Sequence, residues 1–110
     1  MLHFLKSLLR NNAYENLTAI SFLEKFRNTP DAMLIDVRTP VEVAAGQLEG
    51  AVNIDFISSN FTDLIGKLDK EKAYFVYCRS GVRSANACQK MHEMGFERLA
   101  NLAGGYLAVK

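Results

Sequence analysis

The sequence predicts an α/β domain in which a mostly parallel central sheet of four to five strands is flanked by helices. Two observations predict this class. Short apolar runs bounded by turn residues alternate with amphipathic helical segments, which is the pattern of βαβ units. The chain has 110 residues, 49% of them hydrophobic, which is enough for one buried core. We therefore expect a single domain over residues 1–110.

The first elements are an edge strand, a helix and a buried strand. Residues 14–17 can add an edge strand to the sheet, and Thr18 can cap the helix that follows. The apolar face of this helix has the spacing i, i+3, i+4, i+7 and consists of Ala19, Phe22, Leu23 and Phe26. The apolar run 33–37 follows a turn at Pro30 and predicts a buried strand.

A short helix with a defined start comes next. Thr39 and Glu42 have the spacing of a capping box, and Pro40 occupies the first helical position. Gly46 is a typical helix stop, so this helix is little more than one turn long. The apolar run 50–54 then predicts a second buried strand.

The second half of the chain repeats the alternation. The helix after Asn60 has an apolar face made of Phe61, Leu64, Ile65 and Leu68. The run 73–77 is rich in aromatic and β-branched residues and predicts a strand. The polar loop 78–84 leads into a helix that stops at Gly95. That helix buries Ala87, Cys88, Met91 and Met94. Residues 98–102 predict the last strand.

Charge and hydropathy exclude several classes of function. Thirteen Lys and Arg against twelve Asp and Glu leave no basic footprint for nucleic acid. No apolar run approaches the roughly 18 residues of a transmembrane segment. The sequence therefore indicates neither a nucleic-acid-binding protein nor a membrane-spanning one.

Residues 1–12 are an amphipathic N-terminal extension. Lys6 interrupts its apolar run, so the segment lacks the apolar region of a signal peptide. A helix here would have one apolar face made of Phe4, Leu5, Leu8 and Leu9. We expect it to dock on its own domain or on a second subunit, and attachment to a membrane surface is the alternative. The oligomeric state stays open.

The chain has two cysteines, Cys78 and Cys88, which is few for a small domain that depends on disulfides. One is expected in a loop and the other well inside a helix, so their Cα atoms should lie beyond the ~7 Å limit for a bridge. We therefore expect a reducing, cytoplasmic setting. With only His3 and His92 as further ligands, no metal site is predicted. We interpret Cys88 as a core residue, and a resolving cysteine is the alternative.

Cys78 has the surroundings of a reactive thiolate. It ends an apolar strand and opens a loop that leads into a helix, where free backbone N–H groups and a positive helix end are expected. Arg79 and Arg83 add positive charge, and Gly81 lets the loop curl so that its N–H groups point inward. We therefore predict a lowered pKa for the Cys78 thiol and a catalytic, nucleophilic role. The anion-binding loop is Arg79, Ser80, Gly81, Val82 and Arg83.

Three further residues are expected to support this loop. Ser84 closes it, and Asp36 and Arg38 lie at the carboxyl end of a neighbouring strand. We expect Asp36 to pair with a loop arginine or a backbone N–H group and so to hold the shape of the loop. Arg38 is either part of the scaffold or a contact of the substrate.

Five blocks of the sequence occur in the order that is typical of one family, and they are 34–42, 46–54, 78–84, 95–96 and 102–105. In these blocks the chain resembles the rhodanese (thiosulfate sulfurtransferase) family, which implies a three-layer rhodanese-like fold. Gln47 stands where that family usually has a histidine, and Val43 replaces a common aromatic residue. No tryptophan follows Gly105. We interpret these differences as changes in packing and turns.

The resemblance implies a persulfide mechanism. The loop cysteine of that family takes the outer sulfur of a donor such as thiosulfate and passes it to a thiophilic acceptor, which can be cyanide, a small thiol or a protein of a sulfur relay. The nucleophile corresponds to Cys78 and the N–H cradle to residues 79–83. Two half-reactions on one cysteine predict ping-pong kinetics. Neither a metal nor an organic cofactor is expected.

Two other functions compete with this hypothesis. The first is a non-catalytic or partner-restricted rhodanese module that serves sulfur relay or protein interaction. The second is a phosphatase or arsenate reductase of the same fold, whose loop has five residues between cysteine and arginine. Here four residues separate Cys78 from Arg83, and the smaller ring favours a sulfur atom over a tetrahedral phosphate.

Overall fold

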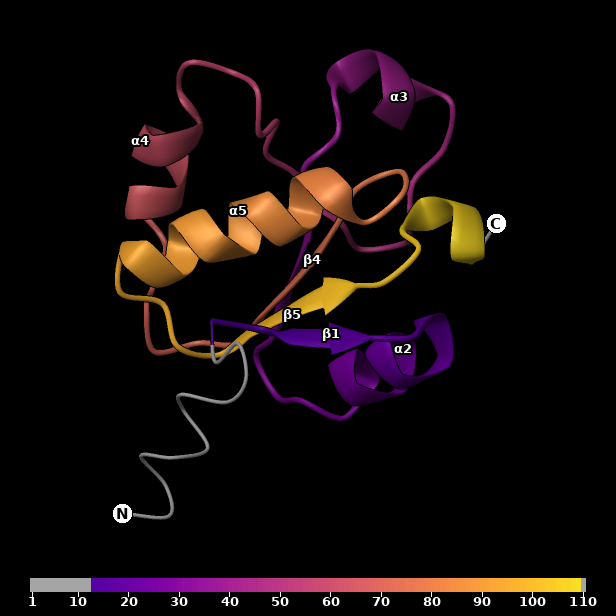
Figure 1. Ribbon diagram of the computed structural model, residues 1–110, viewed down its shortest axis with the longest axis horizontal. Helices are drawn as coiled ribbons and strands as arrows, with labels where there is room; N and C mark the ends of the chain where they lie inside the picture. Colours follow the sequence, from indigo (N-terminus) through magenta and orange to yellow (C-terminus); the bar gives the residue numbers. More distant parts are fainter. Residues whose placement is uncertain (1–12, 110) are drawn as a thin grey trace.

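The computed structural model describes residues 13–109, so the extension predicted at residues 1–12 lies outside the described part. Strands and helices alternate along the chain (Figure 1). The elements are β1 (Glu15–Leu17), α2 (Ala19–Arg27), β2 (Met33–Asp36), α3 (Pro40–Ala44), β3 (Val52–Asn53), α4 (Phe61–Gly66), β4 (Tyr74–Tyr77), α5 (Val82–Glu93), β5 (Leu99–Leu102) and the 3₁₀ helix η1 (Tyr106–Ala108). Within residues 13–109, no helix is both long enough and apolar enough to span a bilayer.

The five strands form one sheet in the order β1-β5-β4-β2-β3, and every neighbouring pair is parallel. This arrangement confirms the predicted α/β class and the predicted edge strand. Parallel strands end at the same edge of a sheet, so the residues that follow β2, β4 and β5 come together there. That edge carries Cys78.

The core has two layers because side chains alternate along each strand. In β4, Tyr74 and Val76 face the layer that contains α4 and α5, whereas Phe75 and Tyr77 face α2. The predicted apolar face of α2 is correct, since the rings of Phe22 and Phe26 contact the ring of Phe75 edge-on at 5.4 and 5.5 Å. The sheet is thus covered on both faces, as parallel sheets require (Figure 1).

Several predicted boundaries move. The strand expected at 50–54 is only Val52–Asn53, and it lies at the edge of the sheet, where β2 is its one neighbour within residues 13–109. Helix α4 ends at Gly66 instead of reaching Leu68, although Leu68 still packs against the core. Helix α5 begins at Val82, so the last three residues of the predicted loop 78–84 are helical.

The two predicted helix caps have different outcomes. Thr18 occupies the N-cap position of α2, but its side chain makes no capping hydrogen bond. The capping box of α3 is confirmed. The Thr39 hydroxyl accepts from the Glu42 N–H, and the Glu42 carboxylate accepts from the Thr39 N–H at 3.1 Å. This short helix therefore has a fixed start beside the carboxyl edge of the sheet.

Candidate active site

Cys78 directly follows β4, and its side chain is completely buried. Its Sγ accepts hydrogen bonds from the Gly81 N–H at 3.1 Å and from the Ser84 hydroxyl at 3.3 Å. Burial raises the pKa of the Cys78 thiol, but hydrogen bonds from the Ser84 hydroxyl and from the N–H groups of Ser84, Gly81 and Ser80 outweigh burial and lower the pKa below its usual value. The predicted direction is confirmed. The structure thus stabilises the nucleophilic form of a buried thiol.

The segment after β5 holds the loop from outside. The Tyr106 N–H donates to the Cys78 carbonyl at 2.8 Å, and the Leu107 N–H donates to the Arg79 carbonyl at 3.1 Å. In a trans peptide the next N–H points opposite to the carbonyl, so the bond to the Arg79 carbonyl turns the Ser80 N–H toward the Cys78 sulfur. A Cβ atom on Gly105 would collide with the Arg79 carbonyl, which explains why glycine is required there.

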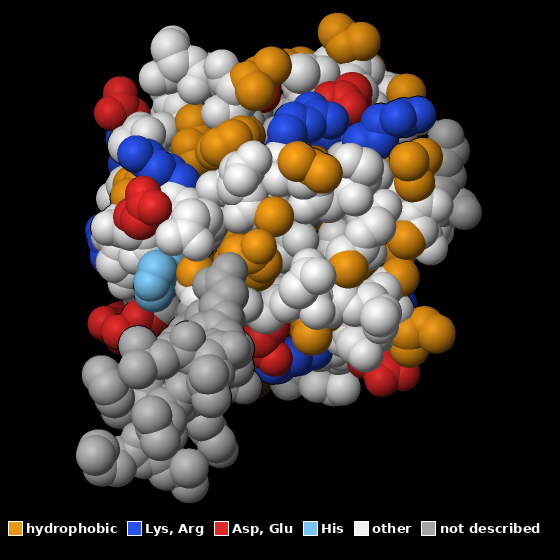
Figure 2. All heavy atoms as spheres, in the orientation of Figure 1, with side chains coloured by type: hydrophobic (Ala, Val, Ile, Leu, Met, Phe, Trp, Pro, Cys, Tyr) orange, Lys and Arg blue, Asp and Glu red, His pale blue; other side chains and the backbone are white. Residues whose placement is uncertain are grey.

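Arg83 makes a two-pronged ion pair with Glu42. Its Nη1 and Nη2 donate to the two carboxylate oxygens at 2.7 and 2.8 Å, which ties the first turn of α5 to α3. The pair holds the pKa of Glu42 at about 2. Figure 2 shows blue and red side chains in contact on the surface between these two helices. The hydrogen bonds from Ser84, Gly81 and Ser80 are the largest contributions that lower the pKa of the Cys78 thiol, and the charge of Arg83, which is paired with Glu42, also acts on Cys78.

Asp36 does not pair with an arginine of the loop, so that part of the expectation is wrong. Its carboxylate accepts from the Arg38 backbone N–H at 3.0 Å and from Nε and Nη2 of the same residue at 2.9 and 2.7 Å. Arg38 Nη2 also donates to the Gly46 carbonyl at 2.7 Å. The Tyr106 ring covers the guanidinium at 4.4 Å. A loop arginine would have to reach past Arg38, which already saturates Asp36 from two residues away.

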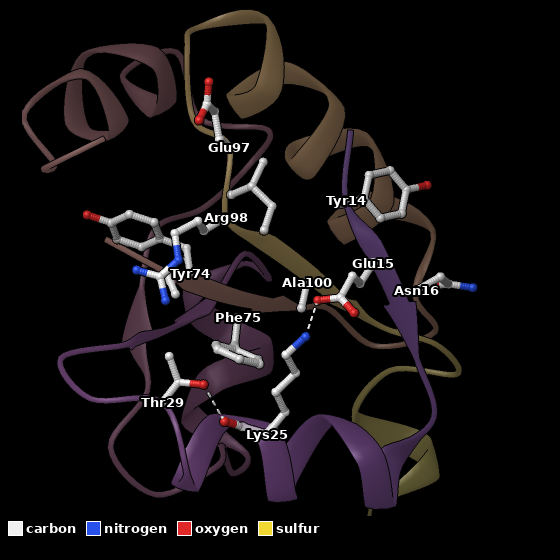
Figure 3. Close-up of a pocket in the computed structure, with 12 residues that line it drawn as sticks. Tyr14, Glu15, Asn16, Lys25, Thr29, Tyr74, Phe75, Glu97, Arg98 and Ala100 are labelled. Atoms are coloured by element: carbon white, nitrogen blue, oxygen red, sulfur yellow. Dashed lines mark hydrogen bonds and ion pairs between the residues drawn. The ribbon is translucent and has the colours of Figure 1, made fainter. Parts of the chain in front are cut away.

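Two cavities differ in their relation to Cys78. A cavity of about 150 Å³ lies beside the loop and is lined by Arg38, Glu42, Ala45, Gly46, Arg79, Tyr106 and Leu107. A larger one of about 590 Å³ lies at the amino ends of β4 and β5, far from the carboxyl edge of the sheet. Figure 3 shows Lys25 of α2 reaching Glu15 of β1 there. No nucleophilic cysteine lines the larger cavity, so size does not locate the site.

Cys88 lies in α5 and is also completely buried. Its thiol donates to the Ala100 carbonyl at 3.8 Å, and burial raises its pKa. Both cysteines are free. Cys88 therefore has the surroundings of a core residue. Within residues 13–109, no group of three or more His, Cys, Asp or Glu side chains could hold a metal ion.

Two contributors to the site were missed at the level of sequence. Glu42 was identified only as part of a helix cap, but it also binds Arg83. Tyr106 supplies a backbone donor to the loop and a ring that covers Arg38. The spacing of a capping box gives no sign of a partner on another helix. The run Gly104-Gly105 before Tyr106 was the available signal of a close backbone approach.

Comparisons with known proteins agree on one family. The family model of the rhodanese-like domain matches residues 19–110. A sulfurtransferase of Allochromatium vinosum is 33% identical over 88 residues, which is 80% of each chain. The thiosulfate sulfurtransferase GlpE of Shewanella oneidensis is 28% identical over 90 residues, covering 82% of this chain and 87% of that one. A rhodanese-like domain protein of Staphylococcus aureus matches with a TM-score of 0.77 at 26% identity, covering 87% of this chain and 91% of that one.

Proposed function

Because this chain belongs to the rhodanese-like domain family, we propose that it is a sulfurtransferase that carries sulfane sulfur as a persulfide on Cys78. The observation that carries the proposal is the buried Cys78 sulfur with converging hydrogen-bond donors from Gly81 and Ser84. A persulfide also holds negative charge on its outer sulfur. Inward N–H groups of a preorganised loop suit that charge.

The reaction has two balanced steps. The Cys78 thiolate attacks the outer sulfur of thiosulfate, a new S–S bond forms, and the S–S bond of the donor breaks as sulfite leaves with its electron pair. A thiophilic acceptor such as cyanide then attacks the outer sulfur of the persulfide. The S–S bond to Cys78 breaks, thiocyanate leaves, and the thiolate returns with its electron pair. A single nucleophile serves both steps, which predicts ping-pong kinetics.

An anionic donor reaches the loop beside Arg79. This side chain is exposed and has no ion pair within residues 13–109. It also lines the cavity of about 150 Å³, which suits a small inorganic anion better than a drug-sized ligand. Arg79 can therefore attract thiosulfate by charge while Cys78 and the loop carry out the chemistry.

A phosphatase activity is less well supported. A phosphatase loop of this kind needs its arginine to clamp the phosphate oxygens. Here the guanidinium of Arg83 is already occupied by both carboxylate oxygens of Glu42. The ring is also one residue shorter than in such phosphatases. A non-catalytic module would not need the donors that lower the pKa of Cys78.

We assign small sulfur donors and thiophilic acceptors as the reaction partners, with a relay protein as the alternative acceptor. Two free cysteines, one of them reactive, suit a reducing compartment such as the cytoplasm. The chemistry of the persulfide requires no metal or organic cofactor.

Intact mass spectrometry of the reduced protein after incubation with thiosulfate tests the proposal. We expect a gain of one sulfur on the natural protein, removal of this sulfur by cyanide, and no gain on Cys78→Ser. Cys88→Ala is the matched control and should gain the sulfur. Folded natural protein that gains no sulfur from thiosulfate or from a second persulfide donor would contradict the proposal.

A further inference from the structure

Asn101 is a polar side chain in an otherwise apolar strand. It lies in β5, after Leu99 and Ala100 and before Leu102, and only 3% of it is exposed. An amide in such a place is costly unless its polar atoms find partners. Its partners therefore indicate what the residue does.

Both hydrogen bonds of this side chain come from its nitrogen. Nδ2 donates to the Asn16 Oδ1 on β1 at 2.9 Å and to the Gly81 carbonyl in the Cys78 loop at 3.3 Å. The Asn101 Oδ1 has no hydrogen-bond partner within residues 13–109. A carbonyl can only accept, so the atom that faces Gly81 must be the amide nitrogen. Within residues 13–109, the Asn101 amide therefore acts as a hydrogen-bond donor through Nδ2, and its Oδ1 accepts no hydrogen bond.

The direction of the Gly81 carbonyl determines where the next N–H group of the loop points. The peptide that follows Gly81 is trans, so holding its carbonyl toward Asn101 turns the Val82 N–H toward the opposite side. The N–H of Gly81 itself donates to the Cys78 sulfur at 3.1 Å. Gly81 has a φ of 102°, and a Cβ atom there would lie 3.1 Å from the Gly104 nitrogen. Its conformation therefore depends on what holds it from outside.

The loop is held at three carbonyls. Backbone N–H groups of the segment after β5 hold those of Cys78 and Arg79, as described above. The third, that of Gly81, accepts from the side chain of Asn101 and from the Ala85 N–H of α5. Among the described residues, the Asn101 side chain makes the one side-chain contact to these three carbonyls, so a substitution can remove it.

We propose that Asn101 is a positioning residue for the reaction of Cys78: by holding the Gly81 carbonyl, it keeps Gly81 in the conformation in which the Gly81 N–H donates to the sulfur. Asn16 assists by accepting the second hydrogen of the amide, and this links edge strand β1 to the loop. The proposal deepens the proposed function and rests on it for the role in sulfur transfer. The orientation of the donors around the thiol is independent of that function.

Replacement of Asn101 by leucine tests the proposal, because leucine has a similar size and no donor. The first readout is the pH dependence of Cys78 alkylation by iodoacetamide, followed by peptide mass spectrometry. The second is the rate of persulfide formation with thiosulfate. For Asn101→Leu we expect the alkylation midpoint to rise and the rate of persulfide formation at pH 7 to fall several-fold, since one partly buried hydrogen bond to the loop is lost. Asn16→Ala should shift both in the same direction by less.

Tyr74→Phe is the matched control, because it removes a partly buried hydrogen bond to the Asp69 carbonyl at the other end of β4. It should lower stability and leave both readouts unchanged. Asn101→Ala, which is shorter and also has no side-chain donor, replaces the leucine variant if that variant does not fold. A natural midpoint in the folded Asn101 variant, or an equal shift in Tyr74→Phe, would overturn the proposal. If the midpoint shifts but the natural protein forms no persulfide, the proposed function fails and the positioning role stands.

Discussion

Cys78 and Cys88 lie ten residues apart in the same core cluster, and both are completely buried. Burial raises the pKa of each thiol. At Cys78, donors from Ser84, Gly81 and Ser80 more than offset it, whereas the Cys88 thiol instead donates to the Ala100 carbonyl. The number of hydrogen-bond donors around the sulfur, rather than its exposure, therefore separates the proposed nucleophile from the core cysteine in this fold.

The largest expected effect follows from removing the reactive thiol. Cys78→Ser should reduce sulfur transfer from thiosulfate to cyanide to the uncatalysed rate, because a serine hydroxyl does not form a persulfide. The fold should survive, since serine is similar in size. Thiocyanate formation and thermal unfolding measure the two effects. A folded Cys78→Ser protein that still transfers sulfur would show that Cys78 is not the nucleophile.

Removing a donor should move Cys78 toward the behaviour of Cys88. The Ser84 hydroxyl is buried and donates to the sulfur at 3.3 Å. We expect Ser84→Ala to raise the pKa of the Cys78 thiol and to slow its alkylation at pH 7 about tenfold, since a hydrogen bond to a charged group contributes about 1.5–3 kcal/mol. The rate should recover as the pH rises. Ala85→Ser, one position further along α5, is the control for a changed side chain in this turn. An unchanged pH profile in Ser84→Ala would contradict the donor explanation.

The Glu42–Arg83 ion pair should make the stability of the fold depend on pH. Its carboxylate has a pKa of about 2 in the folded chain instead of 4.5, so it stabilises the fold above pH 4.5 and loses this contribution as the pH falls toward 2. Urea unfolding of the natural protein should show a loss of stability in this window, and Glu42→Gln should show a smaller one. Glu24→Gln, an exposed carboxylate on α2, should behave like the natural protein.

The same Glu42→Gln variant releases Arg83 from its carboxylate partner. If free positive charge controlled Cys78, alkylation at pH 7 would become faster. We expect instead an unchanged or slightly lower rate, because the donors of the loop stay and the start of α5 is held less firmly. A clear acceleration would show that charge matters more than the hydrogen bonds.

The smallest effect on activity is expected at the other cysteine. Cys88→Ala should retain sulfur transfer within about twofold and lower the free energy of unfolding by about 1–2 kcal/mol, because it removes a buried sulfur from the core. Multiple-turnover kinetics and urea unfolding measure both. A Cys88→Ala enzyme that turns over once and then accumulates as an oxidised form would restore the hypothesis of a resolving cysteine.

Local sequence patterns predicted most of the fold and the surroundings of Cys78. The spacing of Phe22 and Phe26 predicted the buried face of α2, and Thr39 with Glu42 predicted the capping box. The strand-loop-helix pattern around Cys78 predicted a lowered pKa, which the hydrogen bonds of the loop explain. In each case the atoms that interact are close in the sequence or share one periodic face.

The rest depends on contacts between distant segments. Asp36 was expected to bind a loop arginine or a backbone N–H group, and its partners are the backbone N–H and the guanidinium of Arg38, two residues away. Glu42 accepts hydrogen bonds from Arg83, which lies 41 positions further along the sequence, and Asn101 donates to Gly81, which lies 20 positions earlier. Sheet order and register decide these pairs. No periodicity within one segment encodes them, and so the residues that orient the loop could not be predicted.

The most direct test of the role of the hydrogen-bond donors measures the reactivity of both cysteines in one experiment. The folded, reduced protein is alkylated with iodoacetamide across a pH series, and each cysteine is quantified by peptide mass spectrometry. We expect Cys78 to react with a midpoint below the ordinary thiol value of 9.0 and Cys88 to react only after unfolding. Equal rates at the two cysteines, or a Cys78 midpoint at or above 9.0, would contradict it.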